Sequence, residues 1–350
     1  MKKLLLFSLL GLSMHNHPSF TLVTQNILGP NTQDVASFKY LTGDYRRLDH
    51  VLQRVISYNA DIMCFQEWDD TWNNRVAQAD QSTWQLMKIL KTNYQFVSFE
   101  KKGSNGGVVL YCKRQNWTVL DRGTMQLGVG QSGACAWGLL QNQKGEKVLV
   151  ACLHLSRGNQ AGDGRGGSPT YSPSNKDTGQ VQLGIIVTML KTLVGQHKCP
   201  VVLAGDFNTL YQEILNDTLV DLNRLLPLGF QMFQHNSWTS NDSSSNFASI
   251  DHVLYSQGLQ LDLSQSAVGG SANPYQSPNV ATAITKQQDV TKKPIHQAGF
   301  NSDHAPVFVT LCFTGAGGKS VQLGKGGQSG SASPHVTNDL KKALELAKML

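Results

Sequence analysis

Short apolar runs and amphipathic stretches alternate along the chain between residues 20 and 312. Apolar runs bounded by polar residues are typical of buried strands, and they predict strands at residues 20–28, 61–66, 107–112, 147–155, 201–204, 250–255 and 305–312. Apolar residues at helical spacing predict two helices, whose buried faces carry Leu48, Val51, Leu52, Val55 and Ile56 in the first and Leu183, Ile186, Val187, Leu190 and Val194 in the second. With no internal repeat and no break in composition, residues 20–312 are predicted to form one α/β domain of packed sheets with flanking helices.

The first residues are typical of a short signal peptide. Lys2 and Lys3 precede an apolar run at residues 4–12 that ends in the small residues of Gly11-Leu12-Ser13, and these are the parts that such a peptide needs. Because the run is shorter than usual, an apolar leader that is not removed is the alternative. We therefore assign residues 1–19 to a leader and favour export, with a cytoplasmic location as the alternative. No other apolar run approaches the roughly 18 residues of a membrane helix, so no transmembrane segment is expected.

The other end of the chain is predicted to be a linker followed by a short helix. Residues 313–336 are rich in Gly, Ser, Lys and Gln, a composition typical of a flexible linker. In residues 337–350, Leu340, Ala343, Leu344 and Ala347 recur at helical spacing and predict a short amphipathic helix.

Composition excludes several classes of protein. Hydrophobic residues at 40% exclude a disordered chain, and charged residues at 15% exclude a long coiled coil. Four of the six cysteines, Cys64, Cys112, Cys152 and Cys312, lie inside predicted strands, where a lone cysteine acts as a small buried hydrophobe. No pair has CxxC spacing, so structural zinc and thiol redox chemistry have little support.

Polar residues with complementary chemistry stand where the predicted strands begin or end. The six places are Gln25-Asn26, Gln66-Glu67, His154, Gly205-Asp206-Phe207-Asn208, Asp251-His252 and Ser302-Asp303-His304. Strand ends at one edge of a sheet meet in one cleft, and such edges carry function. Each place alone has a structural interpretation, such as a turn or a cap. Together, and in one order, they predict a site.

Hydrolysis of a phosphate ester needs the groups that these places offer. A divalent cation is held by carboxylate and amide oxygens, for which Glu67 and Asn26 are the candidates. An attacking water needs a base, and the candidates are Asp206 and His304, the latter backed by Asp251. Which of the two accepts the proton is left open at this point.

Charge on the transferring phosphoryl group must meet fixed hydrogen-bond donors, for which Asn208 and His154 are suited. A net charge of +6 and an isoelectric point of about 8.9 also suggest a polyanionic partner. However, residues 1–19 hold two lysines and residues 313–350 hold five lysines against two acids, which leaves +1 for residues 20–312. The case for a phosphorylated substrate therefore rests on the site residues.

The order of these motifs resembles the endonuclease/exonuclease/phosphatase superfamily, which has a deoxyribonuclease-like fold. The motifs are Asn26, Phe65-Gln66-Glu67, His154-Leu155, Gly205-Asp206-Phe207-Asn208, Ile250-Asp251-His252 and Ser302-Asp303-His304. The resemblance spans residues 20–312. It implies a four-layered α/β sandwich, with two central, mainly antiparallel sheets flanked by helices, and phosphoester cleavage that depends on Mg²⁺ or Mn²⁺.

The resemblance also implies a role for each matching residue. Asn26 and Glu67 match the family's metal-end residues, and Asp303 matches an acidic residue that contributes to the metal or water network. The implied catalytic residues are His154, which contacts phosphate, Asp206 and Asn208, which orient water and phosphate, and Asp251, which orients His304.

Two departures narrow the branch. Abasic-site endonucleases have an Asp where this chain has Leu28 and a Tyr where it has His154, so DNA-repair incision is disfavoured. The segment 45–67, with its ADI-C-QE strand, is similar to the deadenylase and nocturnin branch. The favoured function is a nuclease that acts on RNA. The alternatives are a phosphodiesterase or phosphatase acting on DNA, a phosphoinositide, sphingomyelin or a nucleotide cofactor, and a catalytically inactive binding module with the same fold.

Substrate choice is expected to lie in the loops. The glycine-rich segment 157–176 directly follows the His154 motif and offers Arg157 and Arg165 as substrate-binding residues. Its length and composition suit a mobile flap, and a disordered insertion is the alternative. The expected partner is a phosphorylated substrate, with nucleic acid favoured. Nothing in the sequence indicates an oligomer, and a monomer is assumed.

Overall fold

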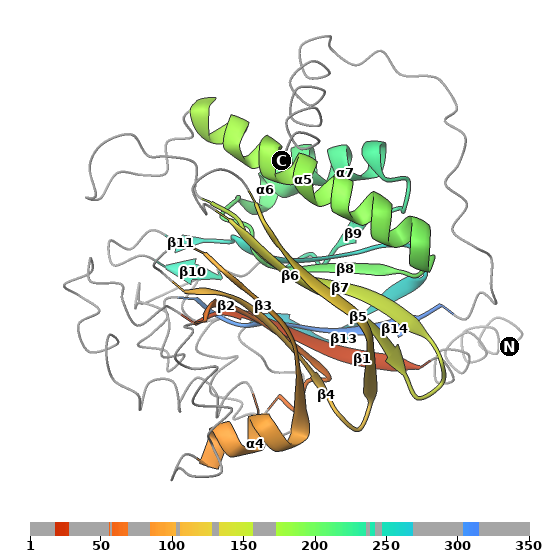
Figure 1. Ribbon diagram of the computed structural model, residues 1–350. Coiled ribbons are helices and arrows are strands. Elements are labelled where there is room, and N and C mark those ends of the chain that lie inside the picture. The colour runs from red at the N-terminus through yellow and green to blue at the C-terminus, as the bar shows by residue number, and fades with distance from the viewer. Residues whose placement is uncertain are drawn as a thin grey trace, which may run out of the picture.

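The computed structural model describes residues 18–27, 56, 58–68, 85–102, 106–127, 133–156, 173–235, 239–241, 247–268 and 304–314. Two six-stranded sheets form its centre, together with a small two-stranded sheet (Figure 1). The first sheet has the order β13-β14-β1-β2-β4-β3, with bounds β1 Ser19–Asn26, β2 Ile62–Trp68, β3 Tyr94–Lys101, β4 Gly107–Lys113, β13 Leu259–Val268 and β14 Val307–Phe313. The second has the order β5-β6-β7-β8-β12-β9, with bounds β5 Trp117–Gln126, β6 Ala134–Asn142, β7 Lys147–His154, β8 Val201–Asp206, β9 Gln231–Met232 and β12 Asp251–Tyr255. The small sheet pairs β10 Ser240–Asn241 with β11 Phe247–Ala248.

Each six-stranded sheet has one parallel pair at its centre and antiparallel neighbours on both sides. The parallel pairs are β1 with β2 and β7 with β8. Because parallel strands end at the same edge, each sheet carries two adjacent carboxyl-terminal strand ends, and the site is built there.

Alternating side chains divide the apolar residues into layers. Along β7, Val148, Val150 and Cys152 pack between the two sheets. Their neighbours Leu149, Ala151 and Leu153 pack on the outer face of the second sheet. The β7 strand is therefore buried on both faces, which is why it is a continuous apolar run in the sequence.

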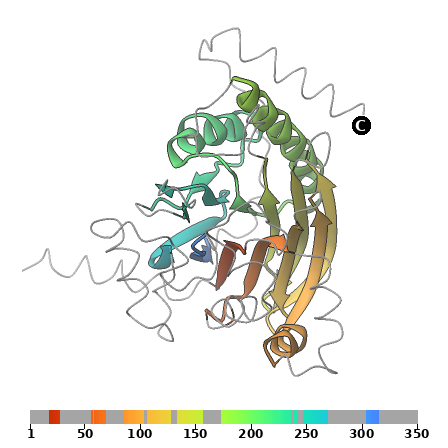
Figure 2. The same cartoon turned by 90° about the vertical axis from the view of Figure 1, so that its left-hand side faces the viewer.

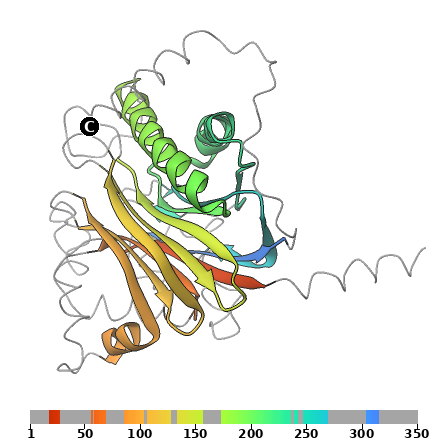
Figure 3. The ribbon, with the colours of Figure 1, turned by 45° about the vertical axis from the view of Figure 1, so that its right-hand side comes forward.

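Helices cover the outer faces of the two sheets. Over the second sheet lie α5 Pro173–His197, α6 Tyr211–Glu213, the π-helical turn Ile214–Thr218 and α7 Leu219–Leu225. Over the first sheet lies α4 Gln85–Asn93, whose Leu90 packs with Val23 and Met63. Figures 2 and 3 show α5 and α7 on one side of the sheets and α4 on the other. This arrangement confirms the predicted sandwich of two mainly antiparallel sheets between helices.

Each of the seven predicted strands corresponds to a strand of the structure, with ends shifted by up to two residues. The second predicted helix lies inside α5, and of the first only Ile56 falls within the described residues. The strands β3, β5, β6 and β13 were not predicted. All six cysteines are free. Of the four interpreted as small buried hydrophobes, Cys64, Cys112 and Cys152 are buried, whereas Cys312 is half-buried.

Several predicted features lie outside the described residues. These are residues 1–17 of the leader, nearly all of the linker, and the C-terminal helix. The strand β1 begins at Ser19 and the strand β14 ends at Phe313. Each of these ends lies one residue outside the predicted domain of residues 20–312. Among the described residues, no helix has the length and apolar character needed to cross a membrane.

Candidate active site

The site continues the inter-sheet layer at the edge where the parallel pairs end. Asn26 follows Phe20 and Leu22 at even spacing along β1, and His154 follows Cys152 in the same way on β7. Asp206 follows Ala204 on β8. Period-two alternation therefore points these polar side chains into the space between the sheets, where apolar packing ends.

Strand register places the second-sheet residues side by side. His154 and Asp206 are Cα partners in the parallel pair of β7 and β8. Asp206 and Asp251 are Cα partners in the antiparallel pair of β8 and β12. Three polar side chains on one face of three adjacent strands thus form one row.

Glu67 reaches the same space through a β-bulge. By simple alternation it would follow Met63 and Phe65 onto the outer face of the first sheet. The pairing with β4 shifts between Gln66 and Trp68, and Glu67 adopts a φ of 59°. A bulge inserts one extra residue into the strand. Glu67 is this extra residue and turns inward, and Trp68 packs in the outer layer with Met63 and Phe65.

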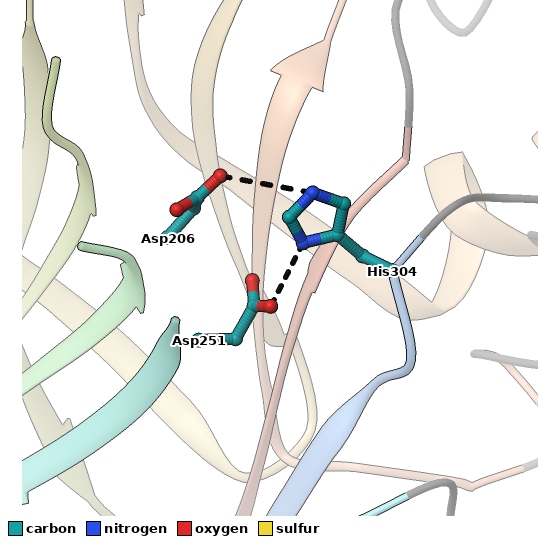
Figure 4. A group of neighbouring side chains, drawn as sticks. All are labelled: Asp206, Asp251 and His304. Carbon is teal, nitrogen blue, oxygen red and sulfur yellow. Dashed lines mark hydrogen bonds and ion pairs between the residues drawn. The ribbon is translucent and has the colours of Figure 1, made fainter. Parts of the chain in front are cut away.

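One carboxylate oxygen lies at the centre of the site. The Asn26 amide donates hydrogen bonds to Asp206 Oδ2 at 3.1 Å and to Glu67 Oε1 at 3.0 Å. Nε2 of His154 lies 3.6 Å and Nε2 of His304 lies 3.9 Å from the same Asp206 oxygen. The site therefore joins residues of both sheets around Asp206, and Figure 4 shows its relation to His304.

His304 is held from behind by Asp251. His304 Nδ1 and Asp251 Oδ2 are 2.8 Å apart, and both side chains are buried (Figure 4). The hydroxyl of Thr239 accepts hydrogen bonds from the backbone N–H groups of Ile250 and Asp251. The carbonyl of Thr239 accepts the N–H of Ala305 at 2.7 Å. A single threonine thus fixes the backbone next to both members of the pair.

Burial and neighbouring charges shift the protonation of the two aspartates in opposite directions. Burial raises the pKa of Asp251 to about 6, although the charge and hydrogen bond of His304 act the other way. Burial would also raise the pKa of Asp206, but His154, His304 and the Lys102 ammonium together hold it below its usual value. Asp206 is therefore an ionised and weakly basic carboxylate.

His154 is a neutral imidazole near pH 7. Burial, and to a smaller extent the Lys102 ammonium, lowers its pKa to about 4, although Asp206 and Glu67 act in the opposite direction. A neutral imidazole in this position is a hydrogen-bond donor or acceptor and carries no charge.

Asn208 stands in the turn after β8 and closes one side of the site. Its backbone N–H donates to Asp206 Oδ1 at 2.8 Å, and its side-chain amide donates to the carbonyl of Leu155 at 2.8 Å. Its φ is 48°, a left-handed conformation that Asn tolerates better than most residues. The residue therefore fixes the Asp206 carboxylate.

Lys102 and His252 lie next to the site but were not predicted as site residues. Neither stands at the end of an apolar run, the feature that marked the predicted residues. Lys102 directly follows β3, and its ammonium donates to Leu155 O at 3.1 Å. His252 is fully buried beside Asp251, and its Nε2 lies 2.9 Å from the carbonyl of Thr209. The Lys-Lys-Gly sequence at residues 101–103 could have indicated Lys102. Its place directly after Asp251 could have indicated His252.

Within the part of the chain that the structure describes, two groups of side chains have the donors for a divalent cation. Donor atoms of Asp206, Asp251 and His304 all lie within 4.8 Å of one another. The closest pair in this group is the 2.8 Å contact between His304 and Asp251, so these atoms already serve each other. The carboxylates of Glu67 and Asp206 converge on the amide of Asn26. Their oxygens match the preference of hard cations.

The structure brings together seven of the ten predicted site residues: Asn26, Glu67, His154, Asp206, Asn208, Asp251 and His304. The other three, Arg157, Arg165 and Asp303, lie outside the described residues.

The site is a row of buried acids and histidines between two sheets, a set of groups suited to hydrolysis, and comparison with known proteins gives the family. The sequence model of the Endonuclease/Exonuclease/phosphatase family matches residues 23–270. The chain belongs to this family and is a hydrolase of phosphoester bonds with a buried Asp/His cluster. No curated protein matches the chain significantly.

Solved structures share the fold at low sequence identity. The human nocturnin catalytic domain with bound sulfate is 16% identical, with a TM-score of 0.52, over 85% of this chain and 96% of that one. ANGEL2, a 2′,3′-cyclic phosphatase, is 15% identical, with a TM-score of 0.59, over 85% and 97%. A mannosyl-6-phosphatase from Bacteroides thetaiotaomicron is 17% identical, with a TM-score of 0.54, over 84% and 100%. Two of these proteins are named as phosphatases of different kinds, and at such low identity the likeness establishes the fold alone.

Proposed function

We propose that this chain is a divalent-metal-dependent nuclease that acts on RNA, with Mg²⁺ or Mn²⁺ as its cofactor. The observation that carries the hydrolytic part of the proposal is the separation of 3.9 Å between Asp206 Oδ2 and His304 Nε2. This distance is too long for a direct hydrogen bond, but one water molecule can bridge the two atoms. An attacking water held there would contact both a carboxylate and an imidazole.

His304 is the proton acceptor in this proposal. The low pKa of Asp206 makes its carboxylate a poor base. Asp251 holds Nδ1 of His304, so Nε2 faces Asp206 and an imidazolium formed there is stabilised by the carboxylate behind it. Asp206 orients the water, and His304 takes its proton.

The remaining residues bind the phosphoryl group and the cation. Glu67, with Asn26 beside it, would hold the divalent cation, which when bound neutralises charge on phosphoryl oxygens and stabilises the leaving oxygen. Neutral His154 donates a hydrogen bond to a phosphoryl oxygen without adding charge. Asn208 keeps Asp206 in place.

The preference for RNA rests on the branch resemblance of residues 45–67. It is supported by Leu28 and His154, which stand where abasic-site endonucleases have Asp and Tyr. The experiment that tests it is an activity panel with Mg²⁺ or Mn²⁺. The substrates are labelled poly(A), mixed RNA, single- and double-stranded DNA, phosphoinositide, sphingomyelin and sugar phosphate.

His304→Ala and Asp206→Ala accompany the wild-type protein, with His197→Ala as a matched control. His197 lies in the last turn of α5 and pairs with Asp121, near the opposite end of β8. We expect EDTA-sensitive turnover of RNA that both site variants lose and the control keeps. Turnover of another substrate class alone would overturn the RNA assignment. No turnover of any phosphoester would overturn the enzyme proposal.

A further inference from the structure

We propose that the Lys102 ammonium binds a phosphoryl oxygen of the substrate beside His154, which makes Lys102 an additional catalytic residue of the site. This inference rests on the proposed function, because it assigns one more residue to the same reaction. It deepens that function by specifying how the site receives a negatively charged group among its own carboxylates.

The position of Lys102 is fixed at its backbone and at its ammonium group. Its backbone N–H donates to the carbonyl of Gly106 at 2.7 Å, which closes the turn between β3 and β4. Its Nζ donates to the carbonyl of Leu155 at 3.1 Å, in the residue that directly follows His154 on β7. The side chain thus spans from the edge of the first sheet to the parallel pair of the second.

The same carbonyl brings Lys102 next to Asn208. Leu155 O accepts both the Lys102 ammonium and the Asn208 side-chain amide, the latter at 2.8 Å. Two donors from different sheets therefore meet at one point beside the site.

The contact with Leu155 places the Lys102 ammonium one residue along the chain from His154. Asn208, the other donor to the Leu155 carbonyl, also holds the Asp206 carboxylate through its backbone N–H. A phosphoryl group that contacts His154 therefore lies beside the same ammonium.

A phosphoryl group needs this cation because the site is acidic. Glu67, Asp206 and Asp251 are the carboxylates of the site, and their negative charges repel an anionic substrate. The transition state of phosphoryl transfer spreads negative charge over its equatorial oxygens, and fixed positive charge stabilises it. Lysine suits this role as a point charge. No proton is transferred, because the amine stays an ammonium throughout.

Neighbouring Lys101 provides a matched control. It is the last residue of β3 and its side chain is exposed, whereas that of Lys102 is partly buried. Lys101→Met removes the same charge from the same strand end without touching the contact with Leu155. Lys102→Met removes the ammonium at similar side-chain length, and Lys102→Arg keeps a cation.

The test measures binding of inorganic phosphate by calorimetry with Mg²⁺ present, and hydrolysis of the substrate found in the activity panel. We expect Lys102→Met to weaken phosphate binding and to lower kcat/KM by about 10- to 100-fold, the effect of losing one charge-assisted hydrogen bond. Lys101→Met should stay within about twofold of wild type because exposed charges are strongly screened. Lys102→Arg should fall between Lys102→Met and wild type.

Thermal melting checks that each variant is folded. If Lys102→Met is not folded, phosphate binding by Lys102→Arg is compared with that by Lys101→Met, and a larger loss in Lys102→Arg supports the inference, whereas equal losses overturn it. Equal phosphate affinity in wild type and Lys102→Met would overturn the inference, as would equal losses in Lys101→Met and Lys102→Met. Phosphate binding does not require turnover. If the wild type hydrolyses no phosphoester, the proposed function fails while the binding result still decides the role of Lys102.

Discussion

Asp206 and Asp251 are direct Cα partners on adjacent antiparallel strands, yet their surroundings lower the pKa of Asp206 and raise the pKa of Asp251. Asp206 faces two imidazoles and the Asn26 amide, whereas Asp251 is fully buried against His304, with a further hydrogen bond to Thr239. Different environments for two neighbouring carboxyls separate their chemical tasks. One is suited to orient water, and the other to hold the base.

Asp251→Asn tests the second task. The amide keeps the shape of the side chain but cannot stabilise an imidazolium at His304, so we expect kcat to fall by about 10²- to 10⁴-fold with little change in KM. Steady-state kinetics on the preferred substrate measure this. Asp217→Asn changes an exposed carboxylate in the π-helical turn and should leave kcat unchanged. A kcat within twofold of wild type in Asp251→Asn would remove Asp251 from the mechanism.

Glu67→Gln tests the cation site. Loss of one carboxylate from an oxygen-donor set weakens the hold on a divalent ion, so the Mg²⁺ concentration for half-maximal activity should rise by about tenfold or more. Titration of activity with Mg²⁺ after EDTA treatment measures it, and calorimetry with Mn²⁺ provides a readout without substrate. Glu146→Gln, in the turn between β6 and β7, serves as the control. An unchanged metal requirement in Glu67→Gln would place the cation elsewhere.

The site residues that the sequence predicts well are those that alternation alone positions. Asn26, His154, Asp206 and Asp251 each extend a buried apolar strand on the inter-sheet face, so the end of the apolar run marks them. Their grouping then follows from strand register, which family resemblance supplies and a single apolar run does not.

Other parts of the site depend on features that apolar periodicity does not reveal. Glu67 faces inward only because of a bulge, which depends on pairing with β4. Lys102 follows β3, whose mixed burial breaks the apolar pattern. The hydroxyl of Thr239 accepts two backbone N–H groups, a role that any threonine in a polar stretch could have. The edge strands β5 and β13 were missed for the same reason as β3, since most of their residues are exposed or half-buried.

His252→Gln tests how a buried histidine lowers the free energy of unfolding at acid pH. Burial lowers the pKa of His252 to about 4, so between about pH 4 and 6.5 the unfolded chain binds a proton that the folded chain does not. The contribution of His252 to the free energy of unfolding therefore falls as pH falls through this range, by at most about 1.4 kcal/mol per pH unit.

Glutamine can still donate to Thr209 O but does not titrate. Urea unfolding at several pH values should therefore give a shallower pH dependence for His252→Gln than for wild type. His154 titrates in the same direction and is expected to leave part of the slope in place. Parallel curves for the two proteins would contradict the neutral buried state of His252.

The last prediction concerns the glycine that supports the Glu67 bulge. Gly106 has a φ of 89°, and a Cβ atom there would lie 2.8 Å from the backbone carbonyl carbon and oxygen of Glu67. Gly145 has a φ of 84°, but a Cβ atom there would meet only the Gln141 side chain at 3.7 Å. Alanine at either position suffers the same backbone strain, and only at Gly106 does it also collide with the bulge.

We expect Gly145→Ala to lower the free energy of unfolding by about 1 kcal/mol, the cost of a left-handed alanine. Gly106→Ala should cost about 2–4 kcal/mol, because overpacking adds to that strain. Activity separates the two variants further, since displacement of Glu67 removes its contact with Asn26 and should raise the metal requirement as Glu67→Gln does. Chemical denaturation and Mg²⁺ titration measure both effects. If Gly106→Ala matched Gly145→Ala in stability and metal requirement, the bulge would not be what positions Glu67.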